Sequence, residues 1–170
     1  MKEPILISIS GMDRPGITAS ITAVLAEFDV NILDIGQSVI HDALSLGMLV
    51  EIPDQVKESE TIKNAVQKKI DELELTVRFV DIHPESYSHW VGQQGKPRHI
   101  VTLLSRRITA HQLSRLAQLV AENGINIDKI TRLSGRVPLE SIGSDGQAGV
   151  EFSLRGRVTD LPALRRQFMV

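Results

Sequence analysis

A four-residue turn near the N-terminus carries groups that could bind a free amino acid. Asp13-Arg14-Pro15-Gly16 follows a strand-like run and precedes a helical pattern. The first amides of a helix lack partners and lie at its positive end, so such a turn can hold a carboxylate while Asp13 binds an ammonium group. Gly16 lets the backbone come close, and Asn31 offers a side-chain donor and acceptor. The alternative is that Asp13 and Pro15 only begin a helix and Asn31 satisfies a turn.

The chain repeats itself at a spacing of 95 residues. The segment 30–35 (VNILDI) reappears as 125–130 (INIDKI), so that Asn31 corresponds to Asn126. A period this long indicates two small domains rather than a solenoid. The second copy has neither proline nor glycine in 108–111, so turn binding is less expected there. Asn126 and Asp128 remain candidates for a site shared with a neighbouring domain.

The first copy predicts strand, helix, strand, strand, helix, strand. Alternating apolar residues indicate strands over 5–10, 31–40, 46–52 and 75–82, and apolar residues at helical spacing indicate helices from Pro15 to Phe28 and over 56–73. Pro15 suits the first helical position. This order is the ferredoxin-like βαββαβ arrangement, an α+β fold with two helices on one face of an antiparallel sheet.

The second copy repeats this order with a longer hairpin loop over 137–147 and ends before a fourth strand. It predicts a strand over 100–104, a helix closed by Gly124, strands from Ile125 and around Phe152, and a last helix near Leu161. The predicted domains are 1–85 and an incomplete 98–170, joined by a linker over 86–97. A missing strand would leave an open edge, which predicts self-association.

Composition excludes several kinds of function. The chain has no cysteine, no signal-peptide pattern and no apolar run of membrane-spanning length, so a soluble cytoplasmic protein without a membrane partner is expected. Its five histidines lack metal-ligand spacing, and His41-Asp42 beside Ser38 lie too close in sequence for a triad. Phosphate-loop, dinucleotide and Asp-x-Asp motifs are absent. The chain is therefore predicted to be noncatalytic, without a cofactor or metal.

The two halves differ in charge. Residues 1–96 hold 8 Lys and Arg against 15 Asp and Glu, a net −7, whereas residues 97–170 hold 11 against 6, a net +5. The halves could pack on each other or on a missing partner. Nucleic-acid binding is disfavoured, because aromatic residues make up 4% of the chain and no binding motif is present.

Three stretches together resemble the N-terminal half of bacterial phosphoserine phosphatases, in which two ACT domains precede a haloacid-dehalogenase-like catalytic domain. These stretches are 9–17 (ISGMDRPGI), 30–37 (VNILDIGQ) and 124–136 (GINIDKITRLSGR). The resemblance implies side-by-side pairing of ACT domains in a homodimer and binding of L-serine or a related amino acid. The implied contacts are Asp13, Arg14, Pro15, Gly16, Asn31, Asn126 and Asp128. It also implies a parent enzyme that uses Mg²⁺ in a catalytic domain absent from this chain.

Two alternatives from other classes remain open. The first is a stand-alone tandem-ACT regulator similar to the glycine cleavage system repressor, which acts through protein partners. The second is an RNA-binding module that uses the arginine-rich half, which predicts salt-sensitive RNA retention.

Overall fold

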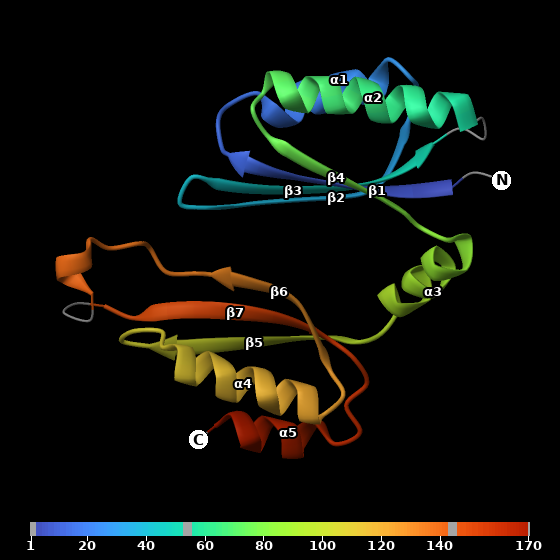
Figure 1. Cartoon of the computed structure of the whole chain (residues 1–170). Coiled ribbons are helices and arrows are strands. Elements are labelled where there is room, and N and C mark those ends of the chain that lie inside the picture. Colours follow the sequence, from blue (N-terminus) through green and yellow to red (C-terminus); the bar gives the residue numbers. More distant parts are fainter. Residues whose placement is uncertain (1–2, 53–55, 143–145, 170) are drawn as a thin grey trace. The chain divides into compact units, whose positions relative to one another are not determined.

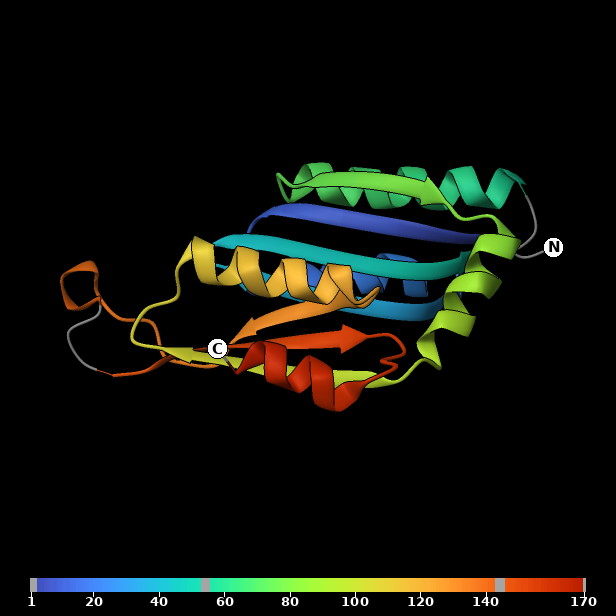
Figure 2. The ribbon, with the colours of Figure 1, turned by 90° about the horizontal axis from the view of Figure 1, so that it is seen from below.

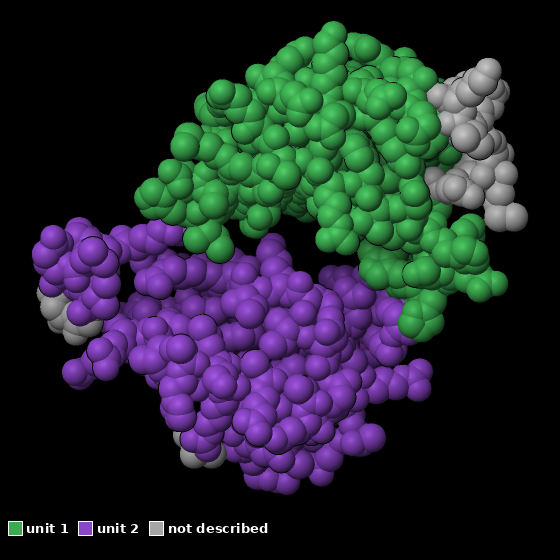
Figure 3. All heavy atoms as spheres, in the orientation of Figure 1, with its two compact units in different colours: residues 1–91 green, residues 92–170 purple. Residues whose placement is uncertain are grey.

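The computed structural model describes residues 3–52, 56–142 and 146–169, with only the backbone of residues 3 and 56–58. The chain divides into two compact units, residues 1–91 and 92–170 (Figure 3). The division falls within the segment predicted as a linker.

Unit 1 is a four-stranded antiparallel sheet with two helices on one face (Figures 1 and 2). The strands lie in the order β2-β3-β1-β4. The elements are β1 (Glu3–Met12), α1 (Ile17–Ala26), β2 (Asn31–Ile40), β3 (Ala43–Ile52), α2 (Val56–Glu72) and β4 (Thr76–Asp81). This is the predicted ferredoxin-like order.

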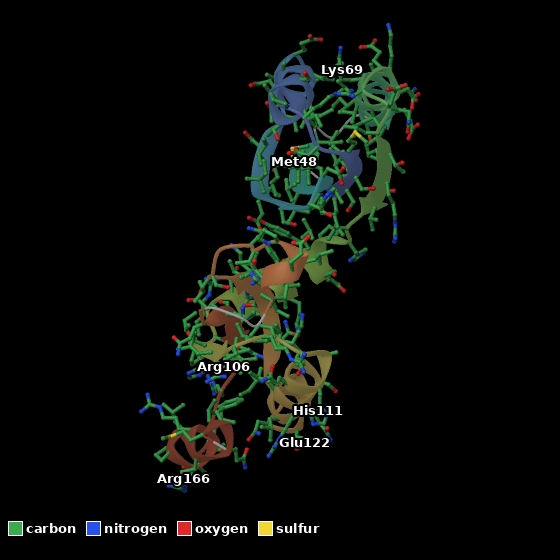
Figure 4. All side chains as sticks on the ribbon, turned by 90° about the vertical axis from the view of Figure 1, so that its left-hand side faces the viewer. Met48, Lys69, Arg106, His111, Glu122 and Arg166 are labelled. Atoms are coloured by element: carbon green, nitrogen blue, oxygen red, sulfur yellow. The ribbon has the colours of Figure 1, made fainter. Side chains whose placement is uncertain are left out.

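The core of unit 1 lies between the sheet and the helices. Alternate residues of β1 and β3 face inward, because side chains along a strand point to opposite faces. Met48 on β3 is fully buried there (Figure 4). The helices contribute their apolar stripes, with Ile21 of α1 and Val66 of α2 also fully buried. The predicted periodicities therefore describe the core correctly.

The pairing of the strands fixes which loops meet. Met12 and Ile40 both pair with Ala43, so the C-terminal ends of β1 and β2 lie at the same end of the sheet, measured along the strands. Pro4 and Asn31 both pair with Glu51, at the opposite end. The turn before α1 and the β2–β3 hairpin therefore share one end of unit 1, and Asn31 lies at the other.

Unit 2 repeats the arrangement with three strands in the order β5-β7-β6 and two helices on one face (Figures 1 and 2). Its elements are β5 (Arg98–Ser105), α4 (Ala110–Glu122), β6 (Asn126–Arg132), the short 3₁₀ helix η1 (Leu139–Ser141), β7 (Ala148–Arg155) and α5 (Leu161–Phe168). Its core is smaller than that of unit 1 and centres on Phe152 and Leu154. Within the described residues of unit 2, no strand takes the position that β4 has in unit 1.

Three local features differ from the sequence predictions. Pro15 is not the first helical residue: α1 begins at Ile17, and Gly16 is the N-cap with a left-handed φ of 92°. Most of the predicted linker is helical, since it lies within α3 (Pro84–Gln94). The proline at the start of α3 is compatible with this, because proline suits a first helical position. The long loop of the second copy contains η1, and its residues 143–145 lie outside the described residues.

Candidate functional site

The predicted turn forms a pocket of about 320 Å³ at the N-terminus of α1. Asp13, Arg14, Pro15 and Gly16 line it, together with the first turn of α1 and Gln37 of β2. No side chain caps α1, so the amides of its first turn lie at the pocket without an acceptor among the described residues. Gly16 adopts a conformation that strongly favours glycine and leaves this backbone open. The pocket can therefore receive a carboxylate.

The turn is held in place from two sides. The backbone amide of Asp13 donates to the carbonyl oxygen of Asp42 at 2.7 Å, which ties the turn to the β2–β3 hairpin. The guanidinium group of Arg14 donates to the carbonyl oxygen of Leu73, just after α2. The Asp13 carboxylate is half-buried and makes no ion pair within the described residues. It remains available for an ammonium group.

Gln37 is a pocket residue that the sequence analysis did not select. Its Oε1 accepts a hydrogen bond from Thr18 Oγ1 at 2.6 Å, across the gap between β2 and α1. The Nε2 amide of Gln37 makes no hydrogen bond within the described residues, so it can donate to a ligand. The alternation along β2 places Gln37 on the same face of the strand as Ile35. This could have indicated Gln37 as a pocket residue only if the contact between this face and α1 had been known.

Asn31 does not join this pocket within unit 1. It begins β2 at the opposite end of the sheet, where its Nδ2 donates to Glu51 Oε2 at 2.9 Å. Gln37 lies six positions after Asn31 along the strand, which corresponds to about 20 Å. A ligand the size of an amino acid cannot touch Asn31 and the turn of the same unit at once.

The predicted second-copy contacts are partners of each other. Asn126 Nδ2 donates to Asp128 Oδ1 at 2.9 Å, and Asp128 Oδ2 lies 2.6 Å from Arg155 on β7. The Asp128 and Arg155 side chains are only 20% and 15% exposed. The exposed Asn126 and the largely covered side chains of Asp128 and Arg155 form a network at the starting end of β6, away from the N-terminus of α4.

The helix N-terminus in unit 2 is closed by its own side chains. Thr109 caps α4 by accepting a hydrogen bond from the amide of Gln112, and the Gln112 side chain accepts one from the amide of Thr109. This capping box satisfies amides that remain free in unit 1. A separate pocket of about 290 Å³ lies beside it, and its lining includes the arginines Arg106, Arg107, Arg132 and Arg136.

His41 and Asp42 form an exposed pair at the tip of the β2–β3 hairpin. His41 Nδ1 lies 2.6 Å from Asp42 Oδ1. The hydrogen bond with Asp42, reinforced by its charge, raises the pKa of His41 above the usual 6.5, and the same bond lowers the pKa of Asp42. No group of three or more metal-ligand side chains occurs in the described ranges.

Two copies of one ferredoxin-like module, the first with a ligand-sized pocket at its strand-to-helix turn, define the class of protein. Residues 3–80 and 97–143 each match a family model described as ACT domain. The chain belongs to the ACT-domain family, as the sequence analysis predicted.

The chain is similar to phosphoserine phosphatases. It is 34% identical over 133 residues to phosphoserine phosphatase SerB2 of Mycobacterium tuberculosis, covering 78% of this chain and 31% of that protein. It is 30% identical over 156 residues to a phosphoserine phosphatase of Streptomyces coelicolor, covering 92% of this chain and 34% of that protein. The chain thus spans about a third of the length of these relatives.

A candidate glycine cleavage system transcriptional repressor shares the fold, with a TM-score of 0.68 and 16% identity, over 99% of this chain and 89% of that one. Among the described residues, no helix has the length and apolar character needed to span a membrane.

Proposed function

We propose that this chain is the amino-acid-binding regulatory region of a phosphoserine phosphatase and that it binds L-serine or a related amino acid. ACT domains are regulatory and noncatalytic, and their usual ligands are amino acids. The observation that carries the proposal is the uncapped pocket at the start of α1. It places free amides for a carboxylate beside the unpaired carboxylate of Asp13 for an ammonium group.

In this proposal the phosphatase relatives indicate the parent enzyme. The parent would hydrolyse O-phospho-L-serine in a separate catalytic domain that uses Mg²⁺, and the present chain would report the level of the product. A reading frame that continues beyond Val170 into an Asp-x-Asp-x-Thr motif supports this parent. A stop codon after Val170 supports the second candidate, a stand-alone tandem-ACT regulator with the fold of the candidate repressor.

Calorimetric titration with L-serine tests the site. We expect Asp13→Ala to abolish the binding signal, because it removes the ammonium partner, with little change in the melting temperature. Asp71→Ala removes an exposed carboxylate from α2 and is the matched control, for which serine binding should be unchanged. Equal serine binding by both variants would remove Asp13 from the site.

Asn31 enters this proposal through a homodimer. Because Asn31 lies at the far end of its own sheet, it can reach a turn pocket only from another copy of the chain. In such a dimer each site combines Asp13 of one protomer with Asn31 of its partner.

Mixing two inactive variants tests the shared site. Asp13→Ala and Asn31→Ala are each expected to bind no serine as homodimers. A mixed dimer of the two variants keeps one of its two sites with both residues intact. Because random exchange of equal amounts makes half of the dimers mixed, mixing should restore binding at about a quarter of all sites. Failure to restore any binding would exclude a site shared in this way, while leaving the result for Asp13 alone unaffected.

A further inference from the structure

The arginine pocket of unit 2 is a concentration of positive charge from separate parts of the chain. Arg106 and Arg107 follow β5, Arg132 ends β6, and Arg136 lies in the loop beyond it. No Asp or Glu is among the described residues that line the pocket. All four arginines are exposed, so an anion can reach them from solvent, and the positive charge that they share along the pocket favours an anion there.

Three of the four arginines have no side-chain partner among the described residues. Arg132 donates to the carbonyl oxygen of Gly135 at 3.3 Å, which orients it toward the loop. Arg106, Arg107 and Arg136 make no side-chain hydrogen bond or ion pair in the ranges that the structure describes. By contrast, Arg155 in the same unit is engaged by Asp128. The free arginines therefore offer several donors in a planar geometry that matches phosphate oxygens.

The remaining lining suits a small ligand. Ser134 lies in the pocket, and its Oγ accepts a hydrogen bond from the amide of Gly149 at 3.2 Å, which leaves its hydroxyl hydrogen free to donate. Ile108, Val137 and Ile142 supply apolar walls. The volume of about 290 Å³ equals that of about ten waters, which accommodates a small metabolite.

We propose that this pocket binds a small metabolite that carries a phosphate group. A single carboxylate would neutralise one arginine, whereas a phosphate carries up to two charges and can accept from several guanidinium groups at once. Ser134 and the apolar walls would contact the rest of the molecule. This site is separate from the turn pocket of unit 1, and the inference does not depend on serine binding there.

A matched pair of ligands tests the proposal. 3-Phosphoglycerate and glycerate differ by the phosphoryl group, and inorganic phosphate serves as a competitor. In calorimetric titrations of the full chain at low salt, we expect 3-phosphoglycerate to bind at least about tenfold more tightly than glycerate, because charge-assisted hydrogen bonds are lost with the phosphoryl group. Inorganic phosphate should compete. Equal binding of both ligands, or no binding of either, would overturn the proposal.

Charge-matched variants separate the pocket from general positive charge. The double variant Arg106→Gln/Arg136→Gln should remove the preference for 3-phosphoglycerate. Arg165→Gln/Arg166→Gln removes the same charge from exposed positions on α5 and should keep the preference. Arg106 and Arg166 lie at different places on unit 2 (Figure 4). An equal loss in both variants would show that net charge, and not the pocket, attracts the anion.

Two further measurements complete the test. Arg106→Lys/Arg136→Lys keeps the positive charge but replaces the planar guanidinium groups with ammonium groups, so we expect an affinity for 3-phosphoglycerate between those of the unaltered chain and the glutamine variant. Because this change is more conservative, the lysine variant also tests the pocket if the glutamine variant does not fold. A single-stranded RNA oligonucleotide tests the competing kind of partner. The proposal would be overturned if RNA bound and 3-phosphoglycerate neither bound nor displaced it. The arginines would then be assigned to nucleic-acid binding. Serine titrations of the Arg106→Gln/Arg136→Gln variant should be unchanged.

Discussion

The two units differ at the same end of one fold, where a strand leads into the N-terminus of the first helix. In unit 1 the N-terminus of α1 is uncapped, and a glycine with φ of 92° precedes it. In unit 2 the N-terminus of α4 is closed by a capping box between Thr109 and Gln112. The same helix end therefore leaves backbone amides open in the first unit and satisfies them in the second, where arginine side chains line a separate pocket. Under the two proposals, the first unit would hold a carboxylate on backbone amides and the second a phosphate on guanidinium groups.

The hairpins beside these helices differ in the same direction. In unit 1 the tip is the pair His41-Asp42, and its backbone holds the turn through the bond from the Asp13 amide. In unit 2 the corresponding connection runs from Arg132 to Ala148 and includes η1. This longer loop supplies Ser134 and Arg136 to the arginine pocket. The short hairpin of unit 1 thus positions the backbone of the turn before α1, whereas the long loop of unit 2 adds side chains to a pocket.

The opposite ends of the two sheets also differ, and this contrast gives the largest expected effect. Asp128→Ala leaves the mostly buried Arg155 without its counter-ion, and we expect the free energy of unfolding of unit 2 to fall by about 2–3 kcal/mol. Asn31→Ala, at the same end of the unit 1 sheet and at the position that corresponds to Asn126, removes an exposed hydrogen bond and should cost about 0.5 kcal/mol or less.

Amide hydrogen exchange measures this prediction in each unit separately. Protection should fall in β6 and β7 of the Asp128→Ala variant and remain in β1 and β3. Similar losses for Asp128→Ala and Asn31→Ala would show that the two ends are energetically alike.

The left-handed glycine sharpens the contrast between the two helix N-termini. A Cβ at Gly16 would meet no atom within 4 Å, so the β-carbon of Gly16→Val causes no clash, and we expect the left-handed backbone strain to cost about 1–2 kcal/mol. The shifted backbone should also abolish serine binding. Gly36→Ala is the control, since its Cβ also meets nothing and its φ is not left-handed. Thermal melts and serine titrations report both effects, and retained serine binding by Gly16→Val would separate the pocket from the left-handed turn.

The capped N-terminus of α4 in unit 2 gives a smaller expected effect on stability. Thr109→Ala removes the side-chain cap of α4 and should lower the free energy of unfolding by about 1 kcal/mol. Serine binding and the phosphate preference should both be unchanged, because neither proposed site uses Thr109. Chemical denaturation followed by circular dichroism measures the loss. A change in serine affinity would show that the cap of unit 2 acts on the pocket of unit 1.

The fold could be predicted because its signals are local. Alternation along β3 and the spacing of Ile62, Val66 and Ile70 along α2 follow directly from strand and helix geometry. The helix α3 was missed because glycine and proline in the same segment are read as breakers, although Pro84 is well placed to begin a helix.

The site could be predicted only where it is continuous in sequence. Asp13 to Gly16 line one pocket because they are neighbours in the chain. Gln37 was missed because its place depends on the contact between Thr18 and β2. The arginine pocket was missed because its residues come from separate segments, and only the net charge of the second half pointed toward it.

The His41–Asp42 pair gives the smallest effect, because both side chains are exposed and screened by solvent. Since the pKa of folded His41 is raised, the pair's stabilisation through His41 is present below pH 6.5 and is lost as the pH rises through the folded pKa. The pKa of Asp42 is lowered, so its share is present above its usual 3.8 and is lost as the pH falls through the folded pKa. An NMR titration of the His41 ring should therefore show a midpoint above 6.5 that returns to the usual value in Asp42→Asn. The carbonyl oxygen of Asp42 accepts a hydrogen bond from the Asp13 amide, so the state of the His41–Asp42 pair can affect the turn. The affinity for serine should therefore weaken slightly as His41 loses its proton. If the affinity for serine does not change over this pH range, the backbone hydrogen bond alone holds the turn.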